Sequence, residues 1–118
     1  MKQDHRKFLR FEAPLDARLR VHGERSPAPT PIHDVSKEGL RLTAKQVLPQ
    51  GTEVKLEIIL PGELVPLFAE ARVRWCQPAR EAWRREHDTG LEITRMDPFD
   101  RSRLLDFAYE KWLHTHIR

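Results

Sequence analysis

Apolar and polar side chains alternate along much of this chain. Between residues 15 and 21, Leu15, Ala17, Leu19 and Val21 are separated by charged residues. A period of two residues places the apolar side chains on one face of an extended backbone, so this segment is predicted to be a half-buried β-strand. Comparable short segments follow at residues 32–35, 40–42, 54–60, 68–75 and 90–93.

Turn signals separate these segments. Glycine and proline cluster at residues 23–29, at Pro49-Gln50-Gly51 and at Pro61-Gly62, and Pro78 ends the fifth segment. Short strands with turns roughly every 8–12 residues are typical of a closed or nearly closed barrel. We therefore expect a mainly β fold, with a six-stranded barrel preceded by a flexible N-terminal arm at residues 1–13.

The end of the chain has a different period. Asp97 followed by Pro98 is typical of a helix N-cap and first helical position. The apolar side chains that follow recur at helical spacing on one broad face. This predicts a C-terminal α-helix that packs on the barrel or on a partner, and it leaves a homodimer through the helix open. The face comprises Leu104, Leu105, Ala108, Tyr109 and Trp112.

Length and composition fit a single folded domain, with residues 14–118 forming the barrel and its helix. The chain has 118 residues, of which 39% are hydrophobic and 33% charged. No apolar run approaches the roughly 18 residues that span a bilayer, so no membrane insertion is expected. Residues 1–6 lack the apolar stretch of a secretory signal, and the single Cys76 fits a reducing compartment. The expected location is the cytoplasm.

Positive charge is concentrated near the N-terminus. Residues 1–25 carry seven basic side chains against four acidic ones, although the net charge of the whole chain is only +3. Such a segment can attract a small polyanion or a nucleic-acid backbone, or can simply be a solvated surface.

Two short motifs give the charge a more specific meaning. Arg6-Lys7-Phe8-Leu9-Arg10 places two arginines four residues apart. Further along, Asp34-Val35-Ser36-Lys37-Glu38-Gly39 leads from the predicted strand at residues 32–35 to the one at residues 40–42. In this order they resemble the PilZ family of bacterial cyclic di-GMP receptors, whose pattern is RxxxR followed by [DN]xSxxG. The resemblance implies a cytoplasmic second-messenger receptor with a small β-barrel and a ligand site between the two motifs.

The resemblance continues through most of the chain. The segment 71–75 is similar to the long central strand of the family, and residues 90–93 to its final strand, although Ile93 stands where an aromatic residue is usual. His5 precedes Arg6 where many members have another arginine. In the family that position bears on whether one ligand molecule or a stacked pair binds, so the stoichiometry stays open.

Arginine suits both parts of cyclic di-GMP. Its planar fork pairs with phosphate oxygens or with the O6/N7 edge of guanine, and it can stack on a base. Four-residue spacing puts Arg6 and Arg10 on one side of either a helix or an extended arm. The alternative is an arm whose arginines are merely solvated.

The second motif offers complementary groups. The Asp34 carboxylate matches the N1–H and N2–H₂ donors of guanine, and the Ser36 hydroxyl can donate or accept. Gly39 permits a positive φ or close approach of the backbone to a ligand. The alternative is a plain turn in which Asp34 and Ser36 bond their own backbone. Trp75 is a further candidate, either stacking on a guanine or packing in the core with Ala71 and Val73.

Other chemistry is not indicated by the sequence. The six histidines and Cys76 lack metal-ligand spacing, and no nucleophile elbow, P-loop or Rossmann fingerprint occurs, so an enzyme, a metal and a cofactor are not expected. The expected function is a cyclic di-GMP receptor or adaptor whose arm becomes ordered on the ligand and alters a surface met by a partner protein. The alternatives are a PilZ-like scaffold that binds no ligand and acts by protein contacts in motility or secretion machinery, and, less favoured, a small nucleic-acid-binding barrel.

Overall fold

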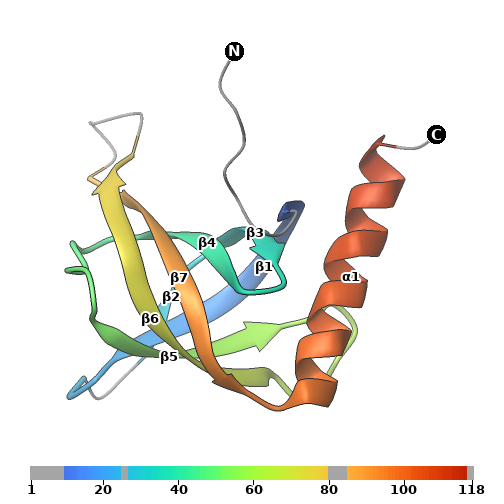
Figure 1. Ribbon diagram of the computed structural model, residues 1–118, viewed down its shortest axis with the longest axis horizontal. Coiled ribbons are helices and arrows are strands. Elements are labelled where there is room, and N and C mark those ends of the chain that lie inside the picture. The colour runs from blue at the N-terminus through green and yellow to red at the C-terminus, as the bar shows by residue number, and fades with distance from the viewer. Residues whose placement is uncertain (1–9, 25–26, 80–84, 117–118) are drawn as a thin grey trace.

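The computed structural model describes residues 10–24, 27–79 and 85–116, which form strands and one C-terminal helix (Figure 1). All strand pairs are antiparallel. The elements are β1 (Arg10–Val21), β2 (Ala28–Pro29), β3 (Ile32–Ser36), β4 (Gly39–Ala44), β5 (Glu53–Ile59), β6 (Leu67–Pro78), β7 (His87–Met96) and α1 (Pro98–His116).

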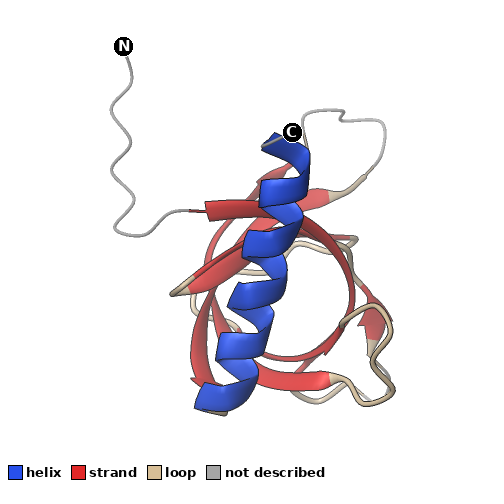
Figure 2. Cartoon of the chain, turned by 90° about the vertical axis from the view of Figure 1, so that its right-hand side faces the viewer, coloured by secondary structure: helices blue, strands red, loops and turns tan. Residues whose placement is uncertain are grey.

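The strands close into a barrel. Neighbouring strands follow the order β1, β3, β4, β7, β6, β5, and β1 then pairs with β5 over residues 16–21 and 54–59. The two-residue β2 pairs with Arg18 and Leu19 of β1. Figure 2 shows the ring of strands with α1 in front of it. The predicted six-stranded barrel with a C-terminal helix is therefore confirmed.

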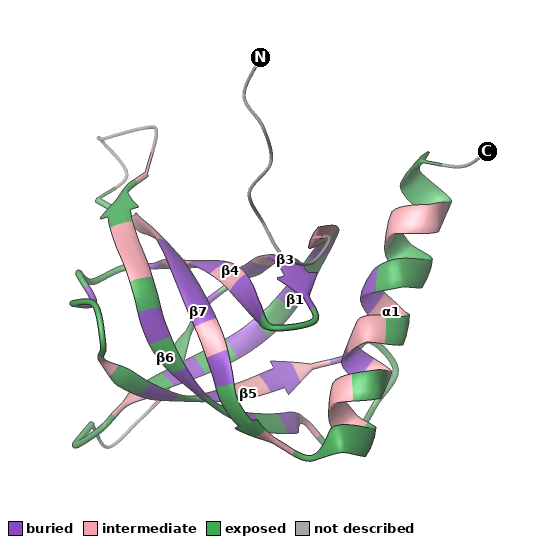
Figure 3. Cartoon of the chain, viewed as in Figure 1, coloured by how far each residue is buried: buried purple, intermediate pink, exposed green. Residues whose placement is uncertain are grey.

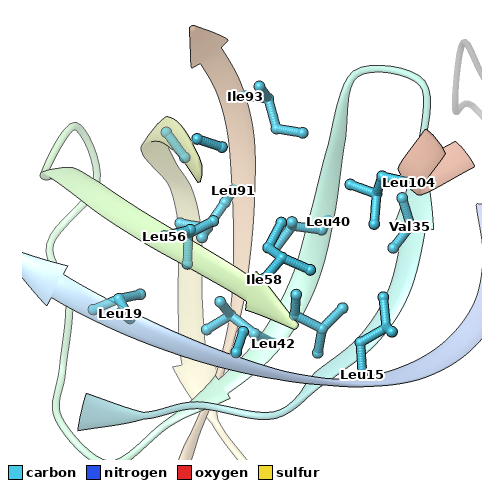
Figure 4. Packing of buried hydrophobic residues seen from close by; sticks show 14 of the residues in the cluster. Leu15, Leu19, Val35, Leu40, Leu42, Leu56, Ile58, Leu91, Ile93 and Leu104 are labelled. Atoms are coloured by element: carbon cyan, nitrogen blue, oxygen red, sulfur yellow. The ribbon is translucent and has the colours of Figure 1, made fainter. Parts of the chain in front are cut away.

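The core lies inside this ring. Alternate residues of β1 and β6 are buried, and those between them are exposed, as the alternating colours of these strands show (Figure 3). Side chains from all six barrel strands meet in one apolar cluster, which Leu104 of α1 joins (Figure 4). The period-two pattern of the sequence thus decides which side chains face the interior. The largest fully buried apolar side chains are Leu19, Ile32, Leu42, Leu56, Ile58, Leu104, Val35 and Val73.

The helix begins where the sequence predicts. Asp97 Oδ1 accepts hydrogen bonds from the backbone N–H groups of Phe99 and Asp100, at 2.9 and 3.1 Å. Of the predicted apolar face, Leu104 and Ala108 are buried, whereas Tyr109 and Trp112 are only partly covered. The helix packs against β1 and β3, and among the described residues no helix is long and apolar enough to cross a bilayer.

Aromatic contacts join the last turns of α1 to the beginning of β1. The Phe11 ring meets Tyr109 and Trp112 edge to face, with centroids 5.5 and 5.9 Å apart. Trp112 also stacks on His116. Residues 10–13, which the sequence analysis assigned to the arm, belong to β1, because Phe11 and Ala13 pack on the core. Residues 1–9, including Arg6, lie outside the described part of the chain.

Candidate ligand-binding site

Four of the six predicted site residues line one hollow on the barrel. The hollow has a volume of about 180 Å³ and lies where the beginning of β1, the β3–β4 turn, the end of β6 and the beginning of β7 meet. The predicted residues in its wall are Arg10, Ser36, Gly39 and Trp75, and the others are Glu38, Leu40, Arg74, Gly90, Leu91 and Glu92.

The turn between β3 and β4 is built from the second motif. Ser36 Oγ accepts a hydrogen bond from the Gly39 N–H at 3.2 Å and lies 3.3 Å from the Gly39 carbonyl oxygen. The Glu38 carbonyl accepts a bond from the Ile93 N–H at 2.9 Å, which holds the turn against β7. Ser36 thus bonds the backbone of the turn, as the turn interpretation expects, whereas the Asp34 carboxylate pairs with Arg41 instead. The same turn brings Ser36 and Gly39 to the hollow.

Gly39 is needed for close packing of two backbones. A Cβ atom at this position would lie 2.0 Å from the carbonyl oxygen of Leu91 on β7. This contact is far shorter than any real Cβ contact, so a side chain would push β4 away from β7. Gly39 thus makes a close approach to a neighbouring strand, and it also lines the hollow.

Asp34 is held between two arginines. Its side chain is 9% exposed, and Arg41 Nε donates to Oδ2 at 2.8 Å. The Nη1 atom of Arg10 lies 3.7 Å from Oδ1, too far for a hydrogen bond, and Oδ1 accepts none from the described residues. One carboxylate oxygen is thus fixed, and the other has unused capacity beside Arg10.

Arg41 was not predicted as a site residue. Asp34 and Arg41 are cross-strand partners, because the turn at residues 36–39 sets the β3–β4 register. Arg41 Nη1 also lies 3.8 Å from Asp88 Oδ1, and Thr43 Oγ1 lies 3.5 Å from the same oxygen. A polar network therefore crosses β3, β4 and β7 behind Arg10. The sequence could have predicted this pairing, because the length of the turn determines which residues of the two strands lie opposite each other.

Trp75 lies over Gly90 on the neighbouring strand. The two residues are cross-strand partners, and a Cβ atom on Gly90 would lie 2.1 Å from the indole Nε1. Trp75 is half-buried and lines the hollow, so it is not a plain core residue like Ala71 and Val73. The indole rests on bare backbone because Gly90 has no side chain. The sequence patterns did not predict this contact of Gly90.

Both charge signs occur around the hollow. Arg74 and Glu92 form an ion pair across β6 and β7, and Glu38 stands on the turn. Arg10 adds a guanidinium that is about a third exposed and only loosely engaged with Asp34. Arg10 is therefore the less tightly paired of the two arginines in the wall of the hollow, whereas Arg74 is the more exposed.

Comparison with known proteins assigns the chain to a family. Residues 4–110 match the model of the PilZ domain. The chain belongs to the PilZ domain family. PilZ domains are non-catalytic receptor domains. In the described part of this one, no group of three or more His, Cys, Asp or Glu side chains is placed to hold a metal ion.

Solved PilZ structures share the fold at low sequence identity. The chain is similar to the Bacillus subtilis inhibitor of motility MotI/DgrA, with 21% identity and a TM-score of 0.77 over 97% of this chain and 54% of that one. It resembles the PilZ domain with c-di-GMP of YcgR from Escherichia coli, with 13% identity and a TM-score of 0.71 over 95% of each chain. It also resembles the K. pneumonia MrkH–c-di-GMP complex, with 17% identity and a TM-score of 0.65 over 92% of this chain and 54% of that one.

These likenesses concern the fold. The chain spans about half the length of MotI/DgrA and of MrkH. A search of curated proteins finds no match.

Proposed function

We propose that this PilZ domain is a receptor for cyclic di-GMP. The observation that carries the proposal is that Arg10, Ser36, Gly39 and Trp75, taken from two motifs and a third strand, line a single hollow with Asp34 just behind Arg10. The PilZ domain of YcgR and the MrkH complex, both similar in fold to this chain, contain c-di-GMP, which supports the choice of ligand.

Each group has a chemical counterpart on the ligand. The fork of Arg10 would pair with a phosphate or with the O6/N7 edge of guanine. The Oδ1 atom of Asp34, which is buried behind the hollow and accepts no bond from the described residues, would accept from the N1–H or the 2-amino group of guanine once the ligand reaches it. Ser36 would donate to a phosphate oxygen. Trp75, supported on Gly90, would stack on a base.

The size of the hollow limits how much of the ligand it can enclose. About 180 Å³ is less than a cyclic dinucleotide with two guanines occupies, so part of the ligand would remain outside the hollow. We propose that the N-terminal arm with Arg6 closes over this exposed part. The arm leads directly into Arg10, whose guanidinium lies 3.7 Å from the Oδ1 atom of Asp34. Closure would change the surface presented to a partner protein, which gives the receptor an output without catalysis.

Calorimetric titration of cyclic di-GMP into the wild type and an Arg6→Ala/Arg10→Ala variant tests the proposal. Each lost charge-assisted contact is expected to weaken binding by roughly 1.5–3 kcal/mol, about tenfold or more in Kd. The matched control is Arg18→Ala/Arg72→Ala, which removes the same charge from two arginines paired elsewhere, with Glu57 and Glu53. The fitted stoichiometry decides between one ligand molecule and two.

Three results would contradict the receptor. A folded wild type that gives no saturable heat would favour the scaffold that acts by protein contacts alone. Equal losses in both double variants would show that only net charge matters. Broad binding of oligonucleotides that falls steeply with salt would favour the nucleic-acid alternative.

A further inference from the structure

A second, larger hollow lies on the outer face of the barrel. Its volume is about 480 Å³, and it crosses β1, β5, β6 and β7. It involves the first residues of β6 and the last of β7, whereas Trp75 and Gly90 stand at the opposite ends of these strands. It is therefore separate from the candidate ligand site. The lining residues used below are Arg18, Arg20, Lys55, Glu57, Phe68, Glu70 and Arg95.

One row of side chains in this hollow combines like charges. Arg20 is the cross-strand partner of Lys55, Lys55 of Glu70, and Glu70 of Arg95. Like charges directly opposite each other on adjacent strands are destabilising. Arg20, Lys55 and Arg95 form no ion pair with any residue in the described part of the chain. The row therefore contains three cations and one anion, and a negatively charged group would neutralise this excess of positive charge.

Exposed apolar side chains lie in this hollow or close in sequence to residues that line it. Phe68 lies in the hollow and is 57% exposed, although it belongs to a strand. Leu64 and Val65 precede it on the β5–β6 connection, which Glu63 ties to α1 through an ion pair of 2.9 Å with Arg103. Phe99, in the first turn of α1, is 72% exposed. Figure 1 shows this connection passing beside the first half of α1.

From this combination we propose that the face binds an acidic segment of a partner protein that also carries an aromatic or aliphatic side chain. The three unpaired cations would neutralise the acidic groups, and the apolar side chain would pack on Phe68, because exposed apolar patches with a polar rim mark protein contacts. Arg20, Lys55, Arg95 and Phe68 together are called the docking face below.

The interspersed carboxylates favour a peptide over a nucleic acid. Glu57, paired with Arg18 at 3.0 Å, and Glu70 in the row itself would repel a continuous phosphodiester backbone. A peptide brings N–H donors as well as carboxylates, so it can bond the carboxylates of the hollow and also neutralise its cations. The inference goes beyond the nucleotide proposal, and it holds whether or not cyclic di-GMP binds at the other hollow.

Selection from a random peptide library displayed on phage, with the full chain as target, tests the docking face. We expect the enriched peptides to share Asp or Glu residues next to an aromatic or aliphatic residue. A synthetic copy of the strongest peptide should bind Lys55→Glu at least tenfold more weakly than the wild type. The matched control is Lys45→Glu, the same charge reversal at an exposed residue just beyond β4, and it should change the affinity less than twofold.

Two further variants separate the components of the face. Phe68→Ser should weaken peptide binding at least fivefold. Arg20→Glu should weaken peptide binding by the same factor, and it should not lower the midpoint of unfolding of the protein, because it removes a like-charge pair. The inference is overturned if no peptide is enriched, if the enriched peptides lack acidic residues, or if Lys55→Glu and Lys45→Glu bind equally. It is also overturned if a single-stranded oligonucleotide binds this face more tightly than the peptide does.

Discussion

At the scale of single residues, the candidate site depends on side chains that support the recognised motifs. Asp34 would contribute little to recognition if its carboxylate could rotate freely, and Arg41 fixes one of its oxygens at 2.8 Å. Trp75 could not pack on the backbone of β7 if Gly90 carried a side chain. Motif residues bear the chemistry that the sequence suggests, while their neighbours across the ladder determine their orientation.

Replacing Arg41 tests this dependence. Arg41→Gln should reduce the free energy of unfolding by about 1–3 kcal/mol, because a buried carboxylate loses its charged hydrogen-bond donor. It should also reduce discrimination between cyclic di-GMP and cyclic di-IMP, which lacks the 2-amino group that we assign to Asp34. Arg41→Lys retains the charge without the fork and should be intermediate.

Arg72→Gln, on the exposed pair with Glu53, is the matched control for Arg41→Gln and should have a small effect on both measurements. Urea unfolding gives the stability, and calorimetry with each nucleotide gives the discrimination. Unchanged discrimination in a folded Arg41→Gln protein would remove Arg41 from the site, even if its stability falls.

Two glycines should respond differently to the addition of a methyl group. In Gly39→Ala the new Cβ would meet the Leu91 carbonyl at 2.0 Å, and backbone must move, so we expect at least about 1–3 kcal/mol of destabilisation. In Gly90→Ala the new Cβ would meet the Trp75 indole, which can rotate away. Its stability should fall less, while its nucleotide affinity falls as the stacking surface is lost. The reverse order of stabilities in urea would refute this assignment.

At the scale of elements, residues close to one another in the sequence explain where the strands and the helix form. Alternation in β1, β5 and β6 sets the inward faces, and Asp97 with Pro98 starts α1. These features depend on residues close in sequence, and they were predictable. The start of β1 at Arg10 was less predictable, because Phe11 is covered by Tyr109 and Trp112, which lie about a hundred positions later in the sequence.

The helix cap can be tested by itself. Asp97→Ala removes the acceptor of two backbone N–H groups and should reduce stability by about 0.5–2 kcal/mol. Asp106→Ala removes the same charge from an exposed position in the middle of α1, so it should change stability little. Thermal unfolding followed by circular dichroism compares the two variants. Equal midpoints would mean that the N-cap contributes nothing to the fold.

At the scale of the whole molecule, the information missing from local patterns is the pairing of distant strands. Closure of β1 on β5 and the pairing of β6 with β7 place Arg10 near Trp75. The two family motifs indicated where the candidate ligand site lies, but the barrel register was needed to find Arg41 and Gly90. The docking face likewise arises only when Arg20, Lys55, Glu70 and Arg95 become neighbours across four strands.

The helix α1 extends between the two candidate surfaces. Near its C-terminal end Trp112 packs on Phe11, next to Arg10, and at its start the exposed Phe99 closely follows Met96 and Asp97, which line the hollow of the docking face. A pair of variants on this one helix should therefore have separate effects. Trp112→Ala removes aromatic contacts worth about 0.5–1.5 kcal/mol and loosens the start of β1, so it should weaken cyclic di-GMP binding and leave the selected peptide unaffected.

Phe99→Ala should have the opposite pattern, with weaker peptide binding and unchanged nucleotide affinity, because its exposed ring supports neither the core nor Arg10. Calorimetric titrations of both variants with both ligands measure the separation. If each variant weakened both ligands equally, the two surfaces would not be independent in the unliganded chain. A nucleotide that changed peptide affinity in the wild type but not in Trp112→Ala would make α1 the connection between ligand and partner.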